Sequence, residues 1–349
     1  MNTTMKGLVY HGPGNRAWEV LPKPDLQKST DALVRITTST ICGSDLHIMK
    51  GDVPTVTDGR ILGHEGVGIV EKVGTGVSNF KSGDKVLISC ITSCGKCDFC
   101  KKGMLSHCRD GGWILGNKID GTQAQFVRIP HADNSLYHLP KECDEAAFVM
   151  LSDIFPTGFE CGVLNGQIKP GDTVVIVGAG PIGLAALLTA QFYSPARTIM
   201  VDPDDNRLRT ARDFGATHTL NNANANPVDV IMTLTCGQGV DVAIEAVGIP
   251  ATLLLCQELI GAGGRIANIG VHGKPVELHM EKLWDRNMTL TTRLVDTTTT
   301  PMLLKMVESG KLHAKLLVTH TFALSDVMKA YDIFGNATSE RALKVILKG

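Results

Sequence analysis

The chain has 349 residues, of which 43% are hydrophobic and 20% are charged, and its formal net charge is −1. This length predicts about two domains, and the balanced charge gives no basic surface for nucleic acid. The sequence shows neither a signal peptide at its start nor the roughly 18 consecutive apolar residues of a membrane span. We therefore expect a cytoplasmic protein, in which ten cysteines favour metal sites or reactive thiols over disulfides.

The first 90 residues favour a β-rich, barrel-like domain, because short apolar segments alternate with Gly and Pro turns. The strands are expected near residues 7–10, 31–37, 67–70 and 84–89. Directly after the second of these, residues 42–47 bring a thiol, a hydroxyl, a carboxylate and an imidazole into six positions. Taken alone, this stretch fits equally well an ordinary turn with a buried cysteine.

Four cysteines with short spacing follow: Cys94, Cys97, Cys100 and Cys108. The pattern C-x2-C-x2-C-x7-C is typical of a structural zinc ion held by four thiolates. Free surface thiols are the alternative, but cytosolic proteins rarely cluster them. Cys90, at the end of an apolar segment, is interpreted as a core residue rather than a ligand.

From about residue 157 strands and helices alternate, which predicts a doubly wound parallel sheet. Residues 173–177 form a continuous apolar run of the kind found in buried parallel strands. Further strands are expected at 198–201, 240–246 and 264–269, and helices at 184–192, 205–214 and 251–260. Beyond residue 297 we expect helices at 302–307 and 324–334 and a strand at 342–347.

A dinucleotide fingerprint joins the first of these strands to its helix. It reads Gly178, Ala179, Gly180, Pro181, Ile182 and Gly183. Asp202 lies at the end of the next strand, where a carboxylate accepts hydrogen bonds from the adenosine ribose and repels a 2′-phosphate. NAD is therefore favoured over NADP, although Arg207 nearby is compatible with the phosphate. Asp202 as a cap of the following helix is the alternative interpretation.

The order of these motifs resembles the zinc-dependent medium-chain alcohol dehydrogenases over nearly the whole chain. Residues 63–77 match that family's zinc motif, Gly-His-Glu-x2-Gly-x5-Gly-x2-Val, at every fixed position. The resemblance implies an α/β fold with a GroES-like β-rich catalytic domain and a Rossmann NAD-binding domain. The catalytic domain would comprise residues 1–156 and 297–349, with a structural-zinc lobe at about 90–112, and the Rossmann domain residues 157–296.

The same resemblance implies a second, catalytic zinc ion, and hence two zinc ions per chain. Its ligands would be Cys42, His64 and Asp153, with aspartate where many family members have cysteine. Glu65 would be able to approach the ion when water or substrate leaves. Asp45 would orient His64 from behind through the other ring nitrogen.

The implied reaction interconverts primary or secondary alcohols with aldehydes or ketones. Zinc would lower the pKa of the bound alcohol so that an alkoxide forms, and the nicotinamide would accept a hydride. Ser44 would pass the proton through the ribose hydroxyl to His47. Polyol, threonine or formaldehyde dehydrogenase chemistry on the same scaffold is one alternative, and a non-catalytic, zinc-stabilised NAD-binding protein is another.

Further site residues are inferred from their proximity to these motifs. Substrate-pocket candidates are Trp113, Ile154 and Leu294, and additional cofactor-binding candidates are Val247, Ile269 and Arg341. Trp113 is equally expected to pack under the cysteine lobe. The compact chain resembles tetrameric family members, so a homotetramer with a small-molecule substrate and no nucleic-acid or membrane partner is expected.

Overall fold

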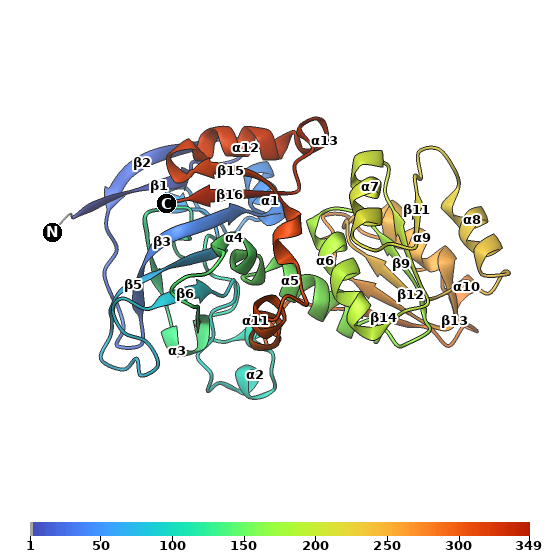
Figure 1. Cartoon of the computed structure of the whole chain (residues 1–349), viewed down its shortest axis with the longest axis horizontal. Helices are drawn as coiled ribbons and strands as arrows, with labels where there is room; N and C mark the ends of the chain where they lie inside the picture. Colours follow the sequence, from blue (N-terminus) through green and yellow to red (C-terminus); the bar gives the residue numbers. More distant parts are fainter. Residues whose placement is uncertain (1–2) are drawn as a thin grey trace. The chain divides into compact units, whose positions relative to one another are not determined.

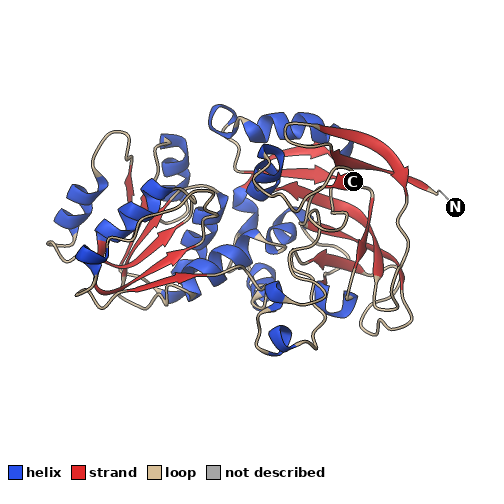
Figure 2. Ribbon diagram, turned by 180° about the vertical axis from the view of Figure 1, so that it is seen from behind, coloured by secondary structure: helices blue, strands red, loops and turns tan. Residues whose placement is uncertain are grey.

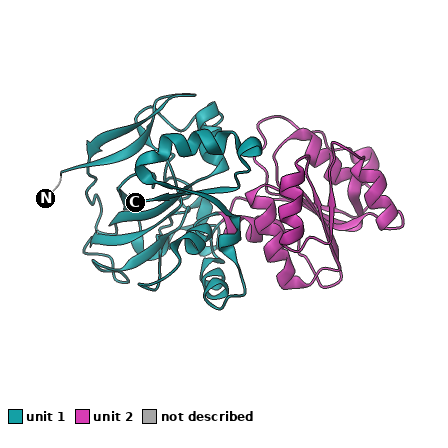
Figure 3. Ribbon diagram, turned by 45° about the horizontal axis from the view of Figure 1, so that its top comes forward, with its two compact units in different colours: residues 1–153, 296–349 teal, residues 154–295 magenta. Residues whose placement is uncertain are grey.

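The computed structural model describes residues 3–349 and divides into two compact units. The first comprises residues 1–153 and 296–349, and the second residues 154–295 (Figure 3). Within the described residues no single helix is long and apolar enough to cross a membrane, while one bent pair, Glu145–Leu151 with Ile154–Leu164, meets the length and composition requirements.

The first unit is built on two β-sheets (Figure 1). The smaller sheet has the order β2-β1-β4, and the larger has the order β15-β16-β3-β5-β6-β8 with β7 paired to β3. The strands are β1 (Thr4–Tyr10), β2 (Arg16–Pro22), β3 (Ala32–Ile41), β4 (Arg60–Ile61), β5 (Gly66–Val73), β6 (Lys85–Ile88), β7 (Phe126–Ile129), β8 (Leu136–His138), β15 (Val318–Ala323) and β16 (Lys344–Lys348).

Strand β3 organises this unit because it pairs with β5, β7 and β16. Its inward side chains Val34 and Ile36 join a fully apolar cluster with Val70 and Val86. At its other end Ile41 enters a second cluster with residues of β16 and α12. The strand therefore delivers Cys42 to a point fixed by two hydrophobic cores.

Short helices close the first unit. They are α1 (Gly43–Lys50), α2 (Asp98–Lys101), η1 (Leu105–His107), α3 (Ala132–Ser135), α4 (Glu145–Phe148), η2 (Val149–Leu151), α11 (Thr300–Glu308), η5 (Ala314–Leu317), η6 (Leu324–Asp326), α12 (Val327–Gly335) and α13 (Ala337–Glu340). Helix α1 begins directly after β3, with Cys42 as its N-cap residue. The sequence pattern did not separate this helix from a turn.

The second unit is a six-stranded, wholly parallel sheet flanked by helices, in the order β11-β10-β9-β12-β13-β14 (Figure 2). Its strands are β9 (Thr173–Val177), β10 (Arg197–Val201), β11 (His218–Leu220), β12 (Val240–Glu245), β13 (Ile260–Asn268) and β14 (Thr289–Thr292). Its helices are α5 (Ile154–Thr157), η3 (Gly158–Leu164), α6 (Pro181–Ala190), η4 (Gln191–Tyr193), α7 (Asp205–Asp213), α8 (Pro227–Leu234), α9 (Pro250–Leu259) and α10 (Met280–Leu283).

The continuous apolar run predicted for residues 173–177 is the fully buried central strand β9. It lies between β10 and β12, so that both its faces and both its edges are covered. This explains why the segment has no polar alternation. The mixed α/β class with a Rossmann-type parallel sheet is thus confirmed.

Candidate active site

Three chain segments of the first unit bring four polar side chains to one buried place. Cys42 caps α1, His64 and Glu65 lie just before β5, and Asp153 follows η2. All four residues are at least nine-tenths buried. Because buried polar groups normally have compensating partners, such a concentration of acids and an imidazole indicates a binding site.

The donor atoms have the spacing that a tetrahedral zinc ion requires. The Cys42 Sγ lies 3.5 Å from Asp153 Oδ2, and the His64 Nε2 lies 3.3 Å from the same oxygen. Zinc bonds of about 2.0 to 2.3 Å separate tetrahedral donors by roughly 3.3 to 3.8 Å. One thiolate, one imidazole and one carboxylate therefore fit the ion and leave its fourth position open.

The charge balance of the site also favours a cation. Burial raises the pKa of the Cys42 thiol and of the Asp45 carboxyl above their ordinary values. Burial opposes a charge on His64, but Asp153 and Cys42 outweigh it and raise the pKa of that imidazole. A divalent ion bound between these groups would compensate the negative charge that burial disfavours.

Glu65 is held in this site by the buried ammonium group of Lys344. Its Oε2 accepts hydrogen bonds from Lys344 Nζ at 2.5 Å and from Thr40, whereas its Oε1 is buried without a hydrogen-bond partner. The nearest ligand atoms of Cys42, His64 and Glu65 all lie within 4.8 Å of one another. Neither Lys344 nor Thr40 was identified from the sequence, where a lysine within a terminal strand carries no motif.

Asp45 lies behind His64, as its predicted role requires, but at longer range than a hydrogen bond. Its Oδ1 is 3.8 Å from His64 Nδ1. Its Oδ2 accepts from the Cys42 backbone N–H and from Gln123 Nε2, each at 2.9 Å. Tyr331 in turn donates to Gln123, so α12 supports Asp45 through a chain that the sequence analysis missed.

The two predicted relay residues differ in their surroundings. Ser44 Oγ lies 3.5 Å from His64 Nε2, beside the metal donors. His47, one turn further along α1, is 40% exposed and its Nδ1 contacts Asp52 Oδ2 at 2.9 Å. Asp52 was not predicted; its place just after the helix, five residues from His47, was the available signal.

Cys90 and Trp113 border the metal donors. The Cys90 thiol is buried and lies 3.6 Å from Asp153 Oδ1, so it is more than the simple core residue expected. Burial raises the pKa of this thiol above its ordinary value. The Trp113 ring stands edge-on to the His64 ring at a centroid distance of 6.0 Å and also packs on the core cluster of α12.

The four lobe cysteines converge as a second candidate metal site. Their sulfur atoms all lie within 4.8 Å of one another. The Cys97 Sγ is 3.5 Å from Cys100 Sγ, and backbone N–H groups of Arg109 and Cys100 lower the pKa of Cys97 to about 6. This donor set and spacing fit a closed zinc site of the structural kind.

In the second unit, each fingerprint glycine meets a different steric demand. Gly178 has φ +105°, in the region that favours glycine, and a Cβ on Gly183 would lie 1.9 Å from the Gly178 carbonyl oxygen. A Cβ on Gly180 would meet no atom within 4 Å, so open space lies over the start of α6. Pro181 and Ile182 open that helix, and a pyrophosphate fits this arrangement.

Asp202 lies after β10 and is 5% exposed. Its oxygens accept from the backbone N–H groups of Ala179 and Asp204, at 2.8 and 2.9 Å. The cap of α7 is Asp204, so the alternative role of Asp202 as that cap is wrong. Arg207 approaches Asp202 at 4.0 Å.

The remaining candidates have weaker support. Val247 is 43% exposed and Ile269 packs against Gly162. Ile154 is buried in α5, and Leu294 is 45% exposed; both belong to the second unit. Arg341 is exposed in the first unit, after α13, with a left-handed backbone.

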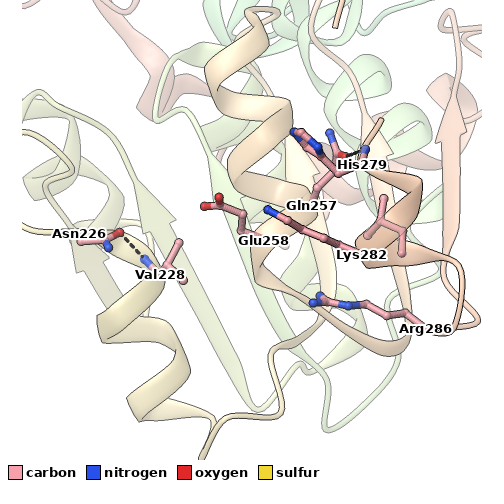
Figure 4. A pocket seen from close by; sticks show the side chains of 8 residues that line it. Asn226, Val228, Gln257, Glu258, His279, Lys282 and Arg286 are labelled. Carbon is pink, nitrogen blue, oxygen red and sulfur yellow. Dashed lines mark hydrogen bonds between the residues drawn. The ribbon is translucent and has the colours of Figure 1, made fainter. Parts of the chain in front are cut away.

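Figure 4 shows a separate cavity of about 350 Å³ in the second unit. It lies between the N-terminus of α8, helix α9 and the α10 region. None of the fingerprint residues and neither Asp202 nor Arg207 lines it. It is therefore distinct from the predicted cofactor site.

Comparison with known proteins identifies the family. The alcohol dehydrogenase GroES-like domain matches residues 28–141, and the zinc-binding dehydrogenase domain matches residues 181–309. The chain belongs to the zinc-dependent alcohol dehydrogenases of the medium-chain dehydrogenase/reductase superfamily.

Individual relatives agree over the full length. An alcohol dehydrogenase of Cupriavidus necator is 36% identical, with 100% of both chains covered. A sorbitol dehydrogenase of Bacillus subtilis is 30% identical over 94% of this chain and 93% of its own. The solved apo form of zinc-dependent alcohol dehydrogenase 2 from Streptococcus pneumonia is 58% identical, with a TM-score of 0.95 and 99% and 98% coverage.

Proposed function

We propose that the chain is an NAD-linked alcohol dehydrogenase that carries two zinc ions and interconverts primary or secondary alcohols with aldehydes or ketones. One observation carries the proposal. Cys42 Sγ and His64 Nε2 lie at distances from Asp153 Oδ2 that suit tetrahedral zinc, and these three donors would leave a fourth position of the ion for substrate. Catalytic zinc sites keep one position open for substrate, whereas structural sites are closed.

Zinc bound there supplies a Lewis acid for the alcohol oxygen, and a bound nicotinamide supplies the hydride acceptor. Ser44 stands beside His64 and is placed to hold the hydroxyl proton of a substrate at that position. His47 lies one turn away with its Nδ1 on Asp52, which leaves Nε2 to exchange a proton with solvent. The ribose hydroxyl of the cofactor is the proposed link between the two side chains.

NAD is proposed over NADP because Asp202 is a buried carboxylate at the end of β10. A 2′-phosphate would meet its negative charge, whereas a ribose diol would donate to it. Arg207 lies too far for a close ion pair and offsets this only in part.

Initial rates with primary, secondary and aromatic alcohols and with sorbitol, each with NAD and with NADP, test the proposal. We expect faster turnover of simple alcohols with NAD and two zinc ions per chain. Cys42→Ala should abolish turnover and leave one zinc ion in the lobe. Full activity of a folded Cys42→Ala protein would rule out the proposed site, and equal rates with NADP would rule out the role of Asp202.

A polyol is the alternative substrate class, because the Bacillus subtilis relative is a sorbitol dehydrogenase. Sorbitol turnover far above that of simple alcohols would favour it. The same rate panel therefore separates the two.

A further inference from the structure

Cys90 contacts a different oxygen of the Asp153 carboxylate from the one that faces the proposed metal donors Cys42 and His64. Its Sγ lies 3.6 Å from Oδ1, whereas Cys42 and His64 face Oδ2. The two oxygens of one side chain thus have different partners. Oδ2 faces the proposed ion, and Oδ1 faces a thiol.

The backbone fixes this contact. The Cys90 N–H donates to the Ser152 carbonyl at 3.0 Å, and the Gly66 N–H donates to Ser152 Oγ at 3.1 Å. The residue before Asp153 is therefore attached both to the Cys90 segment and to the segment that carries His64 and Glu65. Cys90 itself is 2% exposed, so its thiol does not exchange this partner for water.

We propose that Cys90 is a positioning residue for the catalytic metal, whose thiol holds Asp153 Oδ1 so that only Oδ2 faces the ion. A carboxylate is able to bind a metal through one oxygen or through both. Four-coordinate zinc with a second carboxylate oxygen attached would have no position left for an alcohol. Hydrogen-bonded carboxylates around a ligand set are known to govern its affinity and geometry.

The inference depends on the proposed function in one respect, because it requires a metal ion at Cys42, His64 and Asp153. Loss of such an outer partner costs about 10- to 100-fold in metal affinity. Because a thiol is a weak hydrogen-bond donor, we expect its loss to lower the zinc affinity about tenfold, at the small end of this range.

The full-length zinc protein tests it through metal release to a chelator, without reference to activity. Cys90→Val removes the donor, and Cys90→Ser keeps one. Cys256→Val, a buried cysteine of α9 in the second unit, is the matched control. We expect the catalytic zinc to leave Cys90→Val about ten times faster than wild type, Cys90→Ser to be intermediate, and zinc in the lobe and in the control to be unchanged.

Equal rates of catalytic-zinc release from wild type and Cys90→Val would overturn the inference. So would equal release from Cys90→Ser and Cys90→Val, since that would indicate packing rather than hydrogen bonding. In the cobalt-substituted protein, loss of a thiolate-to-cobalt absorption band in both variants would show that Cys90 is a ligand, which also overturns it. Metal in the lobe only, already in the wild type, would contradict the proposed function and the inference together.

Discussion

Lys344 Nζ and Glu65 Oε2 form an ion pair, 2.5 Å long, in which each side chain is only 1% exposed. Lys344 also donates to the Ile41 carbonyl at 3.1 Å, just before Cys42, a proposed zinc ligand. Burial lowers the pKa of Lys344, but Glu65 and Cys42 outweigh it, so the pKa lies above the ordinary value. The first unit thus holds the positive charge of Lys344 next to Glu65, which belongs to the proposed metal site.

Lys344→Met is expected to lower the free energy of unfolding by about 3–5 kcal/mol, because it leaves the Glu65 charge buried and uncompensated. Urea unfolding of the zinc-loaded protein measures the loss. The double variant Lys344→Met/Glu65→Gln should regain most of it, since no isolated charge remains. Equal stability of the single variant and wild type would show that the pair is not needed to compensate Glu65.

A second ion pair predicts a pH dependence. Burial raises the pKa of Glu145, but hydrogen bonds from Thr38 and Lys85 prevail and hold it below the ordinary value of a glutamate. The ionised carboxylate therefore stabilises the fold above the unfolded pKa of about 4.3, and this contribution is lost as pH falls through the folded value.

Glu145→Gln should accordingly cost about 1–3 kcal/mol at pH 7 and flatten the loss of stability below about pH 4.5. Unfolding free energies measured from pH 3 to 7 test this. Glu142→Gln, at an exposed position three residues earlier, is the control and should follow wild type. An unchanged acid profile for Glu145→Gln would argue against the predicted contribution.

The roles of the second and third glycines of the fingerprint are separable by substitution with alanine. Gly180→Ala adds a Cβ that touches no protein atom, so it should fold normally and raise the KM for NAD by at least tenfold by occupying the pyrophosphate space. Gly183→Ala would place its Cβ 1.9 Å from a backbone oxygen and should lower stability as well. Calorimetry and NAD titration of both variants test this pair; normal NAD affinity of Gly180→Ala would place the pyrophosphate elsewhere.

The proposed proton relay predicts that substitutions of His47 and of Asp52 lower kcat by different factors. His47→Gln should lower kcat roughly 10- to 100-fold, because water replaces a positioned proton acceptor. Asp52→Asn keeps the imidazole and should lower kcat only a few-fold. His313→Gln, an exposed histidine of the same unit, is the control. Turnover and its pH profile are the measurements, and wild-type kcat in His47→Gln would exclude the relay.

A substitution in the cysteine lobe is expected to remove the lobe's zinc ion without changing the proposed catalytic residues. Cys97→Ser should reduce bound zinc from about two ions to one per chain and lower stability by several kcal/mol. A hydrogen bond from Ser106 to Asp296, 2.6 Å long, also attaches the lobe to the rest of the first unit. The chain should therefore remain folded at low temperature. Metal analysis and thermal unfolding test this, with Cys143→Ser as control; two ions in Cys97→Ser would exclude a four-cysteine site.

Motifs with fixed spacing were predictable from the sequence, because one backbone geometry imposes them. The turn from β9 to α6 accounts for the fingerprint glycines, and the convergence of the four lobe sulfur atoms fits the spacing that predicted a zinc site. The central strand β9 was equally visible, since burial on both faces demands an unbroken apolar run. The family assignment drawn from these motifs is confirmed.

The supporting residues were not predictable, because their partners are distant in the chain. Lys344 lies 279 residues from Glu65, and Tyr331 lies 208 residues from Gln123. Cys90 looked like a core residue because its sequence context is apolar, and only the fold brings Asp153 to its thiol. The edge strands β14 and β15 were missed for a related reason: neither contains a fully buried residue, and each carries two or more threonines in place of an apolar run.

Strand β16 has a consequence for how the protein is made. It lies between β15 and β3 and supplies Lys344, yet the ribosome synthesises it only after all of residues 154–295. The parallel-sheet unit is continuous in the chain and is able to fold as it emerges. The first unit instead lacks a central strand and the partner of Glu65 until β16 has been synthesised, so we expect the proposed zinc site at Cys42, His64 and Asp153 to form after the parallel-sheet unit.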